Sequence, residues 1–106
     1  MAKYLYQASY TAEGVRGLLK EGGSSRREGV KKMVGSLGGT MEAFYYAFGA
    51  DDVYVIVDVP DNVTAAAAAL AVGASGAVNI RTTVLLTPEE MDAAAKKTVA
   101  YRPPGK

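Results

Sequence analysis

The sequence predicts an α+β domain with a ferredoxin-like βαββαβ order, and three observations carry this prediction. The segment Val53–Val59 alternates valine with other residues, as a strand with one buried face does. Two segments with helical patterns, 11–37 and 63–74, each lie between segments typical of strands. The two middle strands are separated only by the turn GADD, which makes them a hairpin. Right-handed crossovers then place both helical segments on one face of a four-stranded antiparallel sheet of order 4-1-3-2.

The first strand and the first helical region are predicted within residues 3–37. The Tyr-rich KYLYQASY, Lys3–Tyr10, favours a strand. Thr11 is a good N-cap for the helix that follows, and Gly22-Gly23 interrupts that helix. Ser25 and Glu28 have the spacing of a capping box. Behind them lies an apolar stripe at helical spacing, formed by Val30, Met33, Val34 and Leu37. We therefore expect one helix broken at the glycines, or two short helices.

The middle of the chain predicts the hairpin and the second helix. TMEAFYYAF, Thr40–Phe48, favours a strand, and the strand Val53–Val59 follows the turn. Its four valines should face the helices. Pro60-Asp61 ends this strand, and Asp61 caps the alanine-rich helix Val63–Ala74. Five consecutive alanines leave little side chain on this helix, so it can approach the sheet closely.

The last part of the chain predicts a fourth strand, a further helix and a tail. VNIRTTVLL, Val78–Leu86, favours a strand. Thr87, Pro88 and Glu90 then supply an N-cap, a proline at the first helical position and a complete capping box. The final YRPPGK cannot be helical. We expect one domain, 1–97, followed by an extended tail, 98–106.

Composition excludes several classes of function. The 106-residue chain has 49% hydrophobic and 22% charged residues and a net charge of +1, so neither a nucleic-acid binder nor a membrane-surface protein is expected. It contains no cysteine and no histidine, which excludes disulfides, thiol catalysis, His-ligated haem and any triad with an imidazole base. The N-terminal MAKYLYQ lacks the apolar segment of a signal peptide, and no apolar run reaches transmembrane length. We therefore expect a cytoplasmic protein.

The other face of the predicted sheet has no element to cover it. Alternation assigns to this open face Leu5, Gln7, Ser9, Glu42, Phe44, Tyr46, Phe48, Tyr54, Ile56, Asp58, Arg81, Thr83 and Leu85. So large an apolar and aromatic surface predicts a second copy of the chain against it, as in a dimeric α/β barrel. A cavity between two such sheets would be lined by the same side chains. The candidate ligand-binding residues are Gln7, Ser9, Phe44, Tyr46, Tyr54, Asp58, Arg81 and Thr83.

Asp58, in the strongest predicted strand, is the candidate catalytic residue. If a partner sheet closed over it, desolvation would raise the pKa of its carboxyl and make it a general base. The simpler interpretation is a structural ion pair with Arg81 across the sheet or with a partner chain. Arg81 could instead hold an anionic substrate through its planar guanidinium.

The doubled aspartate of the turn also allows two interpretations. Asp is a residue that turns select for its bonds to nearby backbone, so Asp51 and Asp52 have a structural explanation. Their carboxylates could also bind Mg²⁺ or Ca²⁺. Adjacent side chains on a strand point in different directions, however, and this favours the turn over the metal.

The order of motifs along the chain is distinctive. TAEG opens the first helix, FGADDVYVIVDVPD forms the hairpin and the central strand, and GAVNIRTTVLLTPEEMD follows the alanine-rich helix. From about Lys3 to Met91 this order resembles the GYD-domain family of the dimeric α/β barrel group. Gly49 and Asp52 stand in the family's Gly-x-Tyr-Asp signature, with Asp51 in place of the tyrosine. The resemblance implies a family largely of unassigned function, related to cofactor-independent monooxygenases, haem enzymes and ligand-sensing domains.

Three functions are compatible with these observations. The first is a self-associating module that binds a small molecule or a protein through the open face, without a cofactor or metal and without a nucleic-acid or membrane partner. The second is a cofactor-independent monooxygenase or isomerase that uses Asp58, Tyr54, Tyr46 and Arg81. The third is a structural subunit that assembles through the sheet and the tail. The lack of histidine and cysteine favours the binding module over the enzyme.

Overall fold

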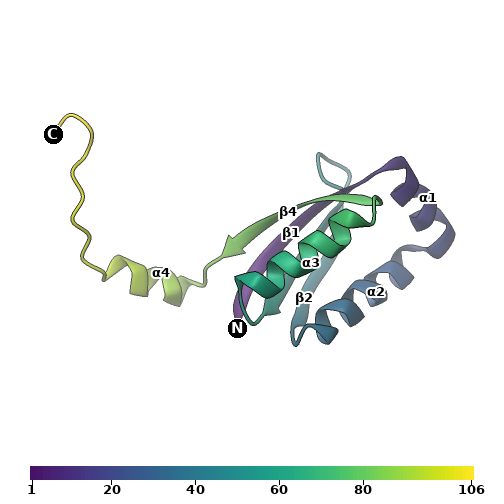
Figure 1. Ribbon diagram of the computed structural model, residues 1–106, viewed down its shortest axis with the longest axis horizontal. Helices are drawn as coiled ribbons and strands as arrows, with labels where there is room; N and C mark the ends of the chain where they lie inside the picture. The colour runs from purple at the N-terminus through teal and green to yellow at the C-terminus, as the bar shows by residue number, and fades with distance from the viewer.

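A computed structural model describes residues 1–106 and contains four strands and four helices. Their order along the chain is β1 (Ala2–Tyr10), α1 (Ala12–Glu21), α2 (Gly23–Ser36), β2 (Thr40–Tyr46), β3 (Val53–Val59), α3 (Asn62–Ala74), β4 (Val78–Leu85) and α4 (Pro88–Ala95). Figure 1 shows the strands side by side with α3 lying across them. Strand β2 ends two residues before the expected Phe48, and β4 ends one residue before the expected Leu86.

The four strands form one antiparallel sheet of order β2-β3-β1-β4. This is the predicted order, 4-1-3-2, counted from the opposite edge. Strands β1 and β3 are therefore central, and each carries alternating buried and half-buried residues along its length. The four valines of β3 are at most 6% exposed, so they form the centre of the core, as the alternation predicts.

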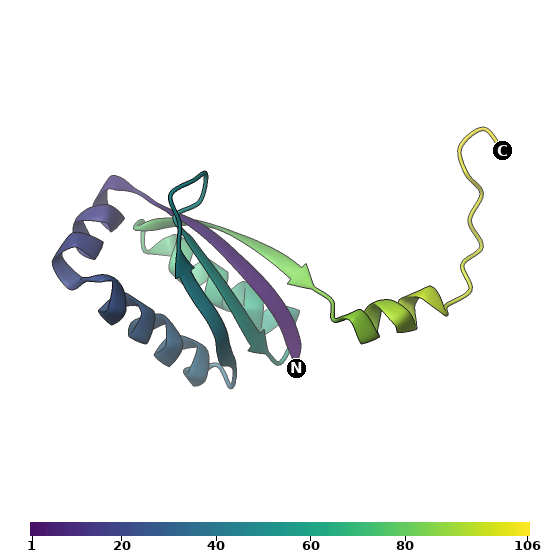
Figure 2. The same cartoon turned by 180° about the vertical axis from the view of Figure 1, so that it is seen from behind.

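Both helical layers pack against the same face of the sheet. Val34 of α2 and Ala65 and Ala68 of α3 belong to one core cluster with the buried side chains of β1 and β3. The small side chains of α3 allow it to lie close enough for the Tyr6 hydroxyl to donate a hydrogen bond of 2.7 Å to the Ala65 carbonyl oxygen. Seen from behind in Figure 2, the strands lie in front of α3.

The helix ends follow the predicted caps with one exception. Thr11, Asp61 and Thr87 each cap a helix through the side-chain oxygen. The expected capping box at Ser25 is wrong, because α2 begins earlier, at Gly23, and its N-cap is Gly22. Gly22 has φ of +89°, a conformation that side chains disfavour, and this residue turns the chain sharply between α1 and α2.

Helix α4 and the chain beyond it project from the body of the domain (Figures 1 and 2). The radius of gyration is 16.9 Å, whereas a compact chain of this length has about 13 Å. The excess reflects this projecting segment, in which Val99 and Tyr101 are 75% and 71% exposed. None of the four helices combines the length and the apolar character that crossing a bilayer requires.

Candidate functional site

The open face of the sheet carries half-buried side chains and no covering helix. Its composition follows from the strand register, in which Gln7 lies between Tyr54 on β3 and Arg81 on β4, and Leu5 lies between Ile56 and Thr83. Because β1 alternates, Ser9 shares this face with them. The structure therefore brings together six of the candidate residues: Gln7, Ser9, Tyr54, Asp58, Arg81 and Thr83.

One end of this face holds a polar network centred on Asp51. Asp51 is the single buried charged residue of the chain, with 6% of its surface exposed. Its Oδ2 accepts hydrogen bonds from the Arg81 guanidinium at 2.5 Å and from Gln7 Nε2 at 3.5 Å. Thr83 donates in turn to Gln7 Oε1 at 3.3 Å. The network joins the hairpin turn to β1 and β4 and fixes the direction of the Arg81 side chain.

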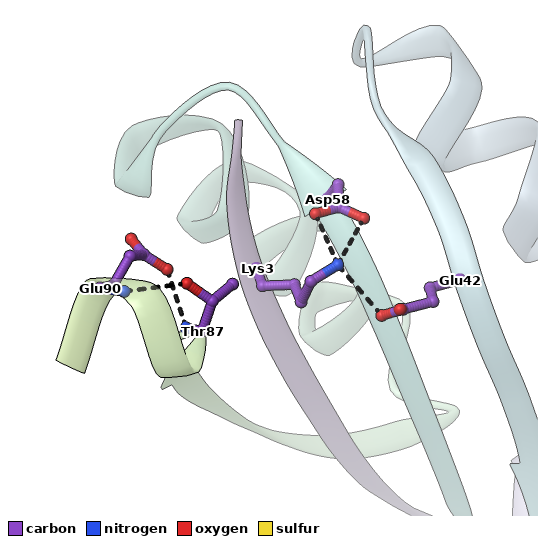
Figure 3. Close-up of polar contacts among 5 residues, drawn as sticks. All are labelled: Lys3, Glu42, Asp58, Thr87 and Glu90. Carbon is purple, nitrogen blue, oxygen red and sulfur yellow. Dashed lines mark hydrogen bonds and ion pairs between the residues drawn. The ribbon is translucent and has the colours of Figure 1, made fainter. Parts of the chain in front are cut away.

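The opposite end of the face holds an ion-pair cluster (Figure 3). Lys3 Nζ lies 3.0 and 3.1 Å from the two carboxylate oxygens of Asp58 and 3.2 Å from Glu42 Oε2. These hydrogen bonds, to Asp58 first and then to Glu42, raise the pKa of the Lys3 ammonium. Asp58 therefore has a structural partner, as the simpler interpretation expected, but the partner is Lys3 and not Arg81.

Phe44 and Tyr46 do not lie on the open face, which corrects the predicted assignment. A bulge at Glu42 shifts the register, so that Phe44 pairs with Val55 and Tyr46 with Val53. Both rings lie on the helix side, 5.2 Å apart in an edge-to-face arrangement. The Tyr46 hydroxyl donates to the Gly23 carbonyl oxygen at 3.1 Å, and burial raises its pKa to about 12. The bulge places Tyr45 opposite Tyr54 instead.

The two motif residues of the hairpin have different roles. Gly49 lies in the exposed loop, and a Cβ placed on it would meet nothing within 4 Å. Asp52 holds the loop against β1, since its Oδ2 accepts from the Tyr10 amide at 2.8 Å and its own amide donates to the Ala8 carbonyl oxygen. Phe48, also expected on the open face, is instead fully exposed in the loop. Asp52 is thus a structural residue of the turn.

The two aspartates do not converge on a common point. Asp51 binds side chains on the open face, whereas Asp52 binds the backbone of β1. No group of three or more Asp, Glu, His or Cys side chains in the chain could hold a metal ion.

Two residues of the site were not among the candidates. Lys3 has a clear signal, because it precedes Leu5 by two positions and therefore shares its face. Asp51 has no such signal, because it lies in a turn, where the alternation of strand side chains does not apply and cannot assign a residue to a face.

The family of the chain follows from a comparison with protein-family models. The GYD domain model matches residues 4–95, which include β2, β3 and β4 and all of β1 except Ala2 and Lys3. The chain belongs to the GYD domain family. This confirms the resemblance drawn from the motif order. No curated protein and no solved structure matches the chain. In this GYD domain the turn residues are Gly49-Ala50-Asp51-Asp52, and Asp51 is the buried acid of the site.

The chemistry available on the open face is recognition by hydrogen bonds and charge. Arg81 is 65% exposed and has one carboxylate partner, so its guanidinium retains free donors. Leu5 and Ile56 form an apolar strip between the Asp51 network and the Lys3 cluster. A ligand on this face would meet a cation at one end and an apolar surface beside it.

Proposed function

We propose that this GYD domain self-associates through the open face of the sheet and binds a small molecule between the two copies. In this arrangement two ferredoxin-like sheets stack face to face as a dimeric α/β barrel. The observation that carries the proposal is the half-buried apolar strip of Leu5 and Ile56, which lies at the centre of a sheet face that no helix covers. A second sheet, about 10 Å away, would remove this strip from water.

The ligand we propose has an anionic or carbonyl oxygen next to an apolar part. Arg81 supplies a fork of donors that matches a carboxylate, and Asp51, which also accepts from Gln7, holds that fork in place. Tyr54 lies across Gln7 from Arg81 and offers a ring and a hydroxyl at the same level of the sheet.

The arrangement supports binding better than catalysis by Asp58. Both oxygens of Asp58 accept hydrogen bonds from Lys3, and a general base needs an oxygen directed at the proton of a substrate. Of the other three residues of the enzyme hypothesis, Tyr46 faces the helices, whereas Tyr54 and Arg81 lie on the open face. Self-association with ligand binding is therefore the proposed function, and enzymatic turnover is not part of it.

Native mass spectrometry of the gently purified protein tests both halves of this proposal. We expect a dimer, or a multiple of dimers, that carries a small adduct. Ile56→Lys, which places a charge in the centre of the open face, should give monomers. Val84→Lys is the matched control, since it alters a β-branched strand residue that pairs with Tyr4 on the helix side and is already 57% exposed.

The ligand half has its own variant. Arg81→Gln should keep the dimer and lose the adduct, because it removes the cationic fork and little apolar surface. A wild-type protein that stays monomeric at micromolar concentration would contradict the proposal, because the open face would then tolerate water. An adduct retained in full by Arg81→Gln would contradict the assigned ligand chemistry.

A further inference from the structure

The C-terminal arm, residues 86–106, carries large apolar side chains that no other part of its own chain covers. Four large apolar side chains of the arm are more than half exposed: Leu86, Met91, Val99 and Tyr101. Figures 1 and 2 show α4 continuing away from the end of β4 with the tail beyond it. The Thr87–Glu90 capping box fixes the start of α4 at Pro88, so that only Leu86 and Thr87 separate this helix from β4 (Figure 3).

A matching groove lies at the other end of the molecule. This groove, which we call the end groove, has a volume of about 340 Å³ and lies between α1 and the β2–β3 hairpin. Its lining is mostly apolar and includes Val15, Leu18, Tyr46 and Phe48. Phe48 is fully exposed. The arm leaves the sheet where Leu85 pairs with Lys3, whereas the end groove adjoins Tyr10, at the far end of β1.

We propose that the arm of one copy docks in the end groove of a second copy, and that the contact is reciprocal. The proposal rests on the self-association proposed above. If the two-fold axis of the dimer lies between the two sheets and runs across the strands, the strands of the two copies point in opposite directions. The end of one sheet at which the arm begins then lies over the hairpin end of the partner sheet. Each copy then offers its arm to the groove of its partner, and both exposed apolar features are covered in one closed dimer.

The charges of the two elements favour this pairing. Helix α4 carries three acidic residues and no basic one. Helix α2, which begins at the edge of the end groove, carries four basic residues and a single glutamate: Arg26, Arg27, Lys31, Lys32 and Glu28. Of these five, only Arg27 and Glu28 form an ion pair within the chain. The two helices thus have opposite net charges of equal size, which would align α4 of one copy with α2 of its partner.

The arm is long enough for this contact. Helix α4 spans about 12 Å at 1.5 Å per residue, and the six residues from 96 to Tyr101 can extend over about 20 Å more. Two stacked sheets lie about 10 Å apart, and a helix layer adds about 10 Å more. The tail can therefore pass around the end of the partner sheet to its helix side, where Val99 and Tyr101 would enter the end groove.

Crosslinking between two copies tests the docking directly, because the native chain has no cysteine. One copy carries Tyr101→Cys, and a second copy with a mass tag carries Phe48→Cys. After mixing, a short bis-maleimide should join them into a species with the summed mass of both copies. Ala67→Cys, on the exposed surface of α3, replaces Phe48→Cys in the control and should not be joined above background.

Deletion of residues 88–106 supplies a second measurement. We expect the dimer dissociation constant in sedimentation to rise about tenfold or more, since the contacts of three exposed apolar side chains, Met91, Val99 and Tyr101, would be lost. A wild-type dimer with no Tyr101–Phe48 product above the Ala67 control, and with an unchanged dissociation constant after deletion, would overturn the docking and leave the sheet-to-sheet dimer intact. A monomeric wild-type protein would overturn both proposals.

Discussion

Replacing Gly14 by alanine should destabilise the domain strongly, whereas the same replacement at Gly17, three residues later in α1, should stabilise it. A Cβ on Gly14 would overlap the carbonyl oxygen of Ala77 and lie 2.9 Å from Cδ1 of Tyr10. A Cβ on Gly17 would meet nothing within 4 Å. The two positions share one helix, so both replacements put alanine for glycine in α1, and the steric contact at Gly14 is the main difference between them.

The size of the effect follows from what Ala77 binds. Its carbonyl oxygen accepts from the Thr11 amide at 3.0 Å, while the Thr11 hydroxyl is closer to the Gly76 carbonyl oxygen, at 2.8 Å, than to that of Ala77. Displacing the Ala77 oxygen loses one hydrogen bond of about 1 kcal/mol, and the overpacking adds about 1–3 kcal/mol. We therefore expect Gly14→Ala to cost about 2–4 kcal/mol. Gly17→Ala should gain about 0.5–1 kcal/mol, because alanine loses less backbone entropy in a helix.

Urea unfolding followed by far-ultraviolet circular dichroism measures both variants at one protein concentration. In thermal unfolding, each kcal/mol corresponds to about 4–8 °C in Tm for a domain of this size. Gly14→Ala should therefore melt at least about 8 °C below the wild type, and Gly17→Ala a few degrees above it. If the two variants differed by less than about 0.5 kcal/mol, the close approach of α1 to Ala77 would be refuted.

Three further predictions concern single contacts. A double-mutant cycle of Asp51→Asn with Arg81→Gln should give a coupling of about 0.5–1 kcal/mol in unfolding experiments, since the guanidinium is largely exposed; no coupling would contradict the network. The bond from the Thr87 amide lowers the pKa of Glu90, so the cap of α4 is present above the ordinary value of 4.5 and is lost as pH falls through the lower folded pKa. Amide hydrogen exchange in α4 should become faster as this cap is lost at low pH, and Glu90→Gln should abolish that pH dependence. A pH dependence that persists in Glu90→Gln would contradict the assignment. Burial raises the pKa of Tyr46 to about 12, so the stability that its neutral hydroxyl contributes is lost as pH rises from 10 to 12. In an absorbance titration one tyrosine should ionise at this higher pH, and Tyr46→Phe should remove that step.

Much of the fold was predictable because local patterns and tertiary packing agree. The alternation of β3, the glycines at 22 and 23 and the caps at Thr11, Asp61 and Thr87 each favour one local structure, and the sheet uses all of them. Ser25 and Glu28 failed as a capping box because Gly22, three residues earlier than Ser25, already turns the chain into α2. The side chain of Ser25 instead donates to Glu21.

The faces of β2 were not predictable from alternation alone. In TMEAFYY both alternating sets contain apolar and aromatic residues, so neither set is marked as the buried one. The bulge at Glu42 then reverses the assignment after that residue. Glu42 itself stays on the open face, where Lys3 binds it, while Phe44 and Tyr46 turn to the helices.

The expected ion pair of Asp58 with Arg81 does not form, and the predicted sheet order already explains why. Strand β1 separates β3 from β4, so Asp58 has Lys3 beside it, and Arg81 lies at the level of Tyr54, four residues away along β3. That offset is about 13 Å, too far for a side-chain contact. Arg81 pairs instead with Asp51, whose place in the turn brings it to the same end of the sheet.

The open face therefore has two charged ends of different character. The Lys3 end holds one cation and two carboxylates, whereas at the other end the charge of the exposed Arg81 guanidinium is offset by Asp51. If two copies stack with their strands reversed, the end with an excess negative charge in each copy lies opposite the balanced end of its partner, where the Arg81 guanidinium is exposed. A stack with strands in the same direction would place like ends together. The charge pattern thus favours the reversed arrangement, which is also the one that brings each C-terminal arm to the partner's end groove.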